Sequence, residues 1–205
     1  MPKVVRAFFC LALWALSSSC SESKQPVAFG GFSAFRSVHA ETSATAPSPS
    51  GRHVLSFIAS GPDSTISIDD SANVASVTAP ASYLWGPSEE LILINDGEGS
   101  GMTSRVRLVE HASNGWREIP LYEHLRDLYF IQSRCPINDV LPDAWGLGFV
   151  SDDVLVLMQA AVHANCRPAA DFFVVRYDPR SQKSKQILLA SDARIRYRSM
   201  LPPGY

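Results

Sequence analysis

The sequence lacks a concentration of charge of either sign. Its 205 residues include 18 Lys and Arg against 20 Asp and Glu, a formal net charge of -2, and the basic residues form no long run. Nucleic-acid binding needs a concentrated basic patch that neutralises phosphates. The composition therefore predicts no nucleic-acid partner, and its 46% hydrophobic and 19% charged residues are typical of one soluble globular domain.

The common enzyme motifs are missing too. The glycines of "NDGEGSG" precede an alternating strand pattern, whereas a phosphate-binding loop needs a helix N-terminus. Ser100 has Glu98 two positions before it, so the G-x-S-x-G nucleophile motif is not formed. No CxxC or HxxxH spacing accompanies the cysteines, and the acidic residues lack a calcium-loop register. We predict no catalytic motif, no metal and no cofactor.

The N-terminus carries an export signature. Lys3 and Arg6 precede an unbroken apolar run from Ala7 to Leu16, and small residues follow. This is the layout of a secretory signal peptide, and the run is too short to span a bilayer. We therefore predict a signal peptide at residues 1–19 and a mature protein outside the cytoplasm.

Cys20 follows three serines and resembles the lipobox cysteine of bacterial lipoproteins, which becomes lipidated. The motif departs at Ser17, where a leucine is usual. Two destinations stay open: the free periplasm, or the outer membrane through a lipid on Cys20. That lipid is the only membrane contact we expect.

Export bears on the two cysteines that remain in the domain, Cys135 and Cys166. In an oxidising compartment such a pair is expected to form one disulfide. Two separate buried thiols are the alternative.

Residues 20–47 are rich in Ser, Ala, Thr and Pro, which predicts a flexible tether. Phe29, Phe32 and Phe35 are exceptions in this segment. They either dock on the domain as a first strand or form a short contact segment. We assign the remaining residues 48–205 to a β-repeat domain.

This domain contains three similar units, which begin at Ser50, Ser88 and Ser151. Each has a serine, a turn-like pair, a β-rich apolar run and two further strand patterns. Period-two alternation, as in residues 105–109, marks half-buried strands, whereas the continuous run 91–94 marks a strand covered on both faces. A unit repeated in this way predicts an all-β fold of antiparallel strands.

The stretch Ser48-Pro49-Ser50-Gly51-Arg52 resembles the Ser-Pro-Asp-Gly opening of blades in β-propeller proteins of the bacterial envelope, with Ser50 in place of aspartate. The resemblance covers about residues 48–190 and implies blade-like repeats. Closed propellers have about four to eight blades. Three units therefore predict a partial or atypical propeller or sandwich.

One insertion interrupts the repeats. Leu121, Leu125 and Leu128 have helical spacing, which predicts one short amphipathic helix. We expect it to cap the sheets, and a partner-binding helix is the alternative.

Two functions remain open. The first is a non-catalytic module that binds another protein. In size, export signal and hairpin style the chain is similar to periplasmic immunity proteins, which plug the active site of a toxin with a loop. Irregular loops on a rigid scaffold are where recognition usually resides. The candidate contact residues are Asp96, Glu98, Tyr122, Arg126, Tyr129, Arg134 and Arg167.

The second function is a periplasmic hydrolase. Its site would combine carboxylates with loop histidines, for which the candidates are His53, His111, His124 and His163. Scattered histidines in β-repeats are more often surface or core residues, and acidic pairs at strand ends favour turns. Convergence of the histidines with carboxylates in a pocket would favour the enzyme, and a rigid protruding loop would favour the binder.

Overall fold

The computed structural model describes residues 27–38, 43–60, 63–78, 80–97, 103–136, 142–161, 164–166 and 170–205. The predicted signal peptide, Cys20, Glu98, His163 and Arg167 lie outside these ranges. No helix within the described ranges is both long enough and apolar enough to cross a membrane.

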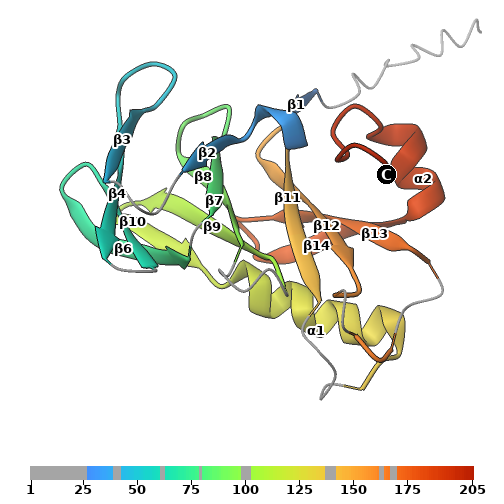
Figure 1. Ribbon diagram of the computed structural model, residues 1–205. Coiled ribbons are helices and arrows are strands. Elements are labelled where there is room, and N and C mark those ends of the chain that lie inside the picture. The colour runs from blue at the N-terminus through green and yellow to red at the C-terminus, as the bar shows by residue number, and fades with distance from the viewer. Residues whose placement is uncertain are drawn as a thin grey trace, which may run out of the picture.

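The described residues form three antiparallel sheets (Figure 1). Sheet 1 contains β3 (Ala44–Pro47), β4 (Val54–Ser60), β5 (Asp63–Ile68) and β6 (Ser71–Thr78). Sheet 2 contains β2 (Arg36–Val38), β7 (Ala81–Trp85), β8 (Leu91–Asp96), β9 (Arg105–Ala112) and β10 (Gly115–Ile119). Sheet 3 contains β1 (Ala28–Gly30), β11 (Asp143–Val150), β12 (Asp153–Gln159), β13 (Phe172–Asp178) and β14 (Lys183–Leu189). The predicted all-β class is confirmed. Each predicted three-strand unit is extended, by β3 in sheet 1, by β2 and β7 in sheet 2, and by β1 and β11 in sheet 3.

Sheet 2 lies between the other two sheets. Its side chains Tyr83 and Ile92 pack with Phe57 of sheet 1 in one core, whereas Leu93 packs with Val156 of sheet 3 in another. Every residue of β8 is buried. The continuous apolar sequence of this strand is thus explained by burial on both faces.

The far face of sheet 3 is covered by the C-terminal segment. Helix α2 (Ala190–Arg196) and the residues after it bring Ala193, Met200 and Leu201 onto Leu155 and Phe172. No pattern in the sequence predicts α2. The helix buries two of its residues, both alanines, so it shows no apolar periodicity.

The predicted helical insertion is confirmed as α1 (Leu121–Ser133). It buries Leu121, Leu125 and Tyr129 in the core between sheets 2 and 3. Figure 1 shows α1 along one side of these sheets. This placement agrees with the expected capping role.

Within the segment expected to be a flexible tether, residues 28–30, 36–38 and 44–47 form edge strands instead. Strand β1 pairs with β11, β2 with β7 and β3 with β4, so the described part of residues 27–47 crosses all three sheets in turn. A short 3-10 helix, η1 (Phe32–Ala34), separates β1 from β2. The docking alternative for Phe29 holds, since Phe29 lies opposite Phe149 in β11. We call residues 27–47 the N-terminal strap.

A buried side-chain amide joins sheets 2 and 3. Asn95 of β8 donates through Nδ2 to the Gly146 carbonyl at 3.2 Å, and its Oδ1 accepts from the Gly146 N–H at 2.6 Å. Any larger residue at position 146 would clash, because its Cβ would lie 2.7 Å from the Leu93 side chain. The amide thus satisfies backbone groups that water cannot reach.

Asn95→Ala should lower the free energy of unfolding by about 2–4 kcal/mol, because it leaves a buried donor and a buried acceptor without partners. Urea denaturation measures this change. The control is Asn114→Ala, in an exposed turn, for which we expect a change within about 0.5 kcal/mol. Equal stabilities of the two variants would contradict the role of Asn95.

Candidate functional site

Two of the predicted histidines meet where sheets 1 and 2 end. His53 directly precedes β4 and His111 lies near the end of β9. Asp69 follows β5, Glu90 precedes β8, and Trp116 is the second residue of β10. We call these five residues the histidine cluster.

Each histidine in the cluster is held by a carboxylate. His53 Nδ1 lies 2.7 Å from Asp69 Oδ2, and His111 Nδ1 lies 2.7 Å from Glu90 Oε2. Trp116 stands beside both rings, with centroid distances of 5.1 and 4.9 Å, and donates from Nε1 to Asp69 Oδ2 at 3.2 Å. The ring centroids of the two histidines are 5.6 Å apart. Two histidine–carboxylate pairs therefore face one another.

Asp69 is the carboxylate with the most partners in this cluster. Besides His53 and Trp116, it accepts from the Val54 N–H at 2.8 Å. Burial works against its ionisation, but the hydrogen bonds from Val54, His53 and Trp116 hold the pKa of Asp69 below its ordinary value.

The His111–Glu90 pair borders a groove of about 270 Å³, which Glu110, Asp152 and Arg180 also line. The side chains of His111 and Glu90 are 40% and 42% exposed, whereas that of His53 is 14% exposed. The outer pair is therefore the accessible part of the cluster. It has the composition of a general base acting on water or on a bound hydroxyl group.

The cluster is incomplete as a catalytic site within the described ranges. No hydroxyl or thiol is hydrogen-bonded to the ring of His53 or His111 there, and no group of three or more His, Cys, Asp or Glu is arranged to hold a metal. His124 lies elsewhere, with Nε2 3.0 Å from Ser184 Oγ and its ring against Tyr177. Of the three predicted histidines that the structure describes, His53 and His111 converge and His124 does not.

Three residues expected to contact a partner are buried. Asp96 accepts from Arg107 Nε at 2.9 Å and from the Thr78 N–H at 3.0 Å. Tyr122 donates to the Pro142 carbonyl at 2.9 Å, and Tyr129 stacks on Phe173. These side chains stabilise the interior. Of the other candidates within the described ranges, Arg126 and Arg134 reach the surface.

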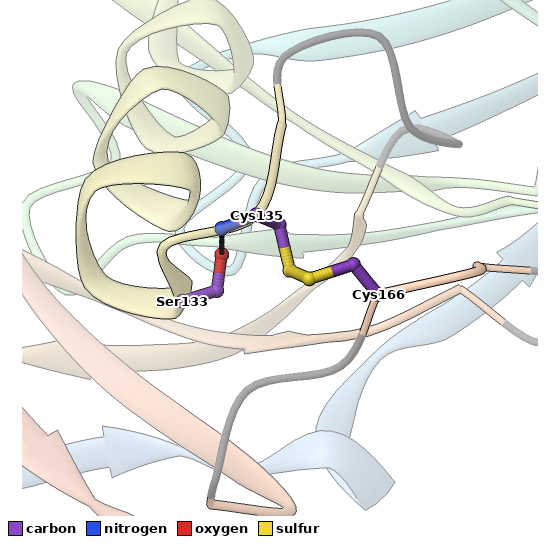
Figure 2. Close-up of a disulfide and its surroundings, with 3 residues drawn as sticks. All are labelled: Ser133, Cys135 and Cys166. Atoms are coloured by element: carbon purple, nitrogen blue, oxygen red, sulfur yellow. Dashed lines mark hydrogen bonds between the residues drawn. A yellow bond between two sulfur atoms is a disulfide. The ribbon is translucent and has the colours of Figure 1, made fainter.

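The predicted disulfide between Cys135 and Cys166 is confirmed (Figure 2). Their Cα atoms are 5.6 Å apart and the cysteines are separated by 31 residues. Arg134 ends α1 in a left-handed conformation (φ 58°), and the Cys135 N–H then donates to Ser133 Oγ at 3.2 Å. The bond therefore fastens the end of α1 to the connection between β12 and β13.

Local sequence patterns indicate only part of the cluster. Asp69 and Glu90 stand in the acidic pairs noted at strand ends, but nothing local links them to a particular histidine. Trp116 was not considered as a site residue. Its contact with Asp69 joins positions 47 residues apart, which depends on how sheet 1 packs on sheet 2.

Comparison of the sequence with models of protein families, with curated proteins and with solved structures finds no match. The resemblance of residues 48–52 to blade openings therefore stays a prediction.

Replacing Cys135 and Cys166 together by serine should lower the free energy of unfolding by about 3 kcal/mol, because the unfolded chain gains the entropy that the closed loop removes. Urea denaturation of the oxidised wild type and the double variant measures the loss. Wild type treated with reductant should match the variant. A loss below about 1 kcal/mol would contradict this stabilisation by loop closure.

The free energy of unfolding should fall at acid pH, because Asp69 becomes protonated there. Because its pKa is lower in the folded than in the unfolded chain, its contribution is complete above about pH 4 and is lost as the pH falls through the folded value. Asp69→Asn should therefore reduce the loss of unfolding free energy between pH 5 and about pH 2. Urea denaturation at several pH values tests this, with Asp70→Asn as the exposed neighbouring control. An unchanged pH profile in Asp69→Asn would contradict the assignment.

Proposed function

We propose that this protein is an exported, non-catalytic module of the bacterial envelope that binds another protein, as an inhibitor or immunity protein does. The observation that carries the proposal is the C-terminal end of α1. Ile131 is 71% exposed there, and Arg134, three residues further on, is exposed too; Arg126, five residues earlier on α1, reaches the surface and bonds to Asp127. We call Arg126, Ile131 and Arg134 the α1 surface.

The α1 surface combines the features of a binding site that is ordered before its partner arrives. The disulfide at Cys135 directly follows it, and the buried face of α1 packs into the main core. Association therefore costs little ordering entropy at this place. Arginine is enriched in protein interfaces, and an exposed isoleucine supplies apolar area to bury.

The scaffold is proposed to consist of blade-like repeats. A left-handed residue occupies the corresponding turn of each unit, at Gly51 (φ 77°), Glu89 (φ 62°) and Ser151 (φ 56°). Each turn is followed within three residues by a strand, namely β4, β8 or β12. The shared turn geometry supports a repeat of one hairpin design, with three units in an open stack.

A hydrolase is the second candidate, and the His111–Glu90 pair at the groove favours it. A general base needs something to activate, either a nucleophilic side chain or a bound water. The described ranges offer neither a hydroxyl bonded to His111 nor a metal cluster. We therefore place the binding function first.

The double variant Ile131→Ala, Arg134→Ala should retain its partner from an envelope extract at least tenfold less than wild type, because central interface residues each contribute more than about 1 kcal/mol. Its melting temperature should change little, since both side chains are exposed. The matched control is Ile195→Ala, Arg196→Ala on α2, which has an exposed isoleucine beside an exposed arginine. Capture is quantified by mass spectrometry.

Undiminished capture by the α1 variant, or an equal loss in the α2 control, would place the interface elsewhere. Hydrolysis of an ester, amide or glycoside substrate by the purified protein, abolished in His111→Ala, would instead support the hydrolase.

A further inference from the structure

A second cleft, of about 370 Å³, opens where the N-terminal strap crosses sheet 2. Its floor is the end of β7, at Tyr83, Leu84 and Trp85. Its walls come from the strap and the turn after it. They comprise Phe29, Ala34, Arg36, Pro47, Ser48 and Pro49.

The cleft exists because strand β2 is shorter than β7. Strand β2 pairs with residues 81–83 of β7, and the strap turns away into η1 before it reaches Leu84. Leu84 and Trp85 are bonded to β8 on their other side. The edge of β7 beyond Tyr83 thus carries no described strand, and the surrounding strap encloses the gap.

Among the residues that line the cleft, one is charged. This residue is Arg36, and within the described ranges no carboxylate pairs with it. Ser48 is already engaged, since its hydroxyl donates to Glu89 at 2.6 Å. By contrast, Arg107 and Arg176 each bind a buried carboxylate. Arg36 is therefore a cation at the mouth of an aromatic cleft.

Trp85, another residue of the lining, carries a buried donor. Its side chain is 4% exposed, and its indole N–H has no hydrogen-bond partner. A buried donor without an acceptor is destabilising, and few such groups persist in folded proteins.

We propose that this cleft binds a small amphipathic carboxylate, with the anionic group on Arg36 and an apolar body against Phe29, Tyr83 and Leu84. The volume falls in the range of small-molecule sites, which is about 300–1,000 Å³. It accommodates a free organic acid or the last residue of a peptide, and these two sources share the same chemistry. A neutral ligand would form no ion pair with Arg36, and a cation would be repelled by it.

Three probes with one apolar body test the charge requirement: 4-phenylbutyrate, 4-phenylbutan-1-ol and 4-phenylbutylamine. Isothermal titration calorimetry of the mature protein should show saturable binding of the carboxylate. The alcohol should bind about tenfold more weakly, because it loses a charge-assisted hydrogen bond, and the amine should bind more weakly still.

Two variants test whether the probes bind in this cleft. Arg36→Ala should bring 4-phenylbutyrate to the affinity of the alcohol. Ala34→Phe fills the cleft from an exposed position, so all probes should lose binding while the melting temperature is retained. Arg198→Ala, an exposed arginine outside the cleft, is the control and should bind like wild type.

Two tripeptides distinguish the sources. Gly-Gly-Phe with a free C-terminus binding more tightly than 4-phenylbutyrate, and more tightly than its C-terminal amide, indicates a peptide end. The reverse order indicates a free organic acid.

The proposal is overturned if no probe binds at millimolar concentration, if acid and alcohol bind equally, or if Arg36→Ala leaves their ratio unchanged. The Ile131→Ala, Arg134→Ala variant should bind 4-phenylbutyrate normally. The proposal for this cleft and the proposal for the α1 surface can therefore be contradicted independently.

Discussion

The pairing of the N-terminal strap with the first strand of every sheet is the constraint on which the rest of the structure depends. An open sheet edge presents unpaired N–H and C=O groups and invites aggregation. The strap covers such an edge on β11 and on β7, and then itself becomes the first strand of sheet 1. Its approach to β11 requires glycine: a Cβ at Gly148, where φ is 136°, would lie 2.5 Å from the Phe29 carbonyl oxygen. One segment therefore closes two edges and connects all three sheets.

The outer faces of sheets 3 and 1, at the two ends of the stack, are covered to different extents. The far face of sheet 3 is covered by α2 and the C-terminal residues, which bury Met200 and Leu201 against it. The corresponding face of sheet 1 leaves Val54 and Ile58 exposed on β4, at 42% and 49%. Between these ends, sheet 2 contributes to both interior cores. On the face toward sheet 3, the buried Asn95 amide forms hydrogen bonds to Gly146. A directional bond of this kind restricts how one sheet can slide on the next.

Sequence patterns predicted the features that depend on residues close together in the chain. Period-two alternation and apolar runs located three strands of each unit but neither β7 nor β11, leucine spacing located α1, and the cysteine count with the expected compartment gave the disulfide. The strap was missed because strands of three or four residues, rich in Ala, Ser and Thr, are too short to show a period. The histidine cluster could not be assembled, since His53 meets Asp69 across 16 residues and Trp116 meets it across 47. Tyr122 and Tyr129 were expected at the surface because an aromatic residue suits a core and an interface equally well.

The α1 surface and the cleft belong to opposite sides of the same stack, as Figure 1 shows for α1 and for strands β1 and β2. They nevertheless share one core. Leu84 lines the cleft and packs in the same apolar cluster as Leu125 of α1. A close-packed protein interior does not deform gradually. It moves as packed units instead. The disulfide holds the end of α1, and strand pairing holds the strap, so both surfaces rest on rigid elements. A ligand that binds to one surface therefore does not have to order the other surface.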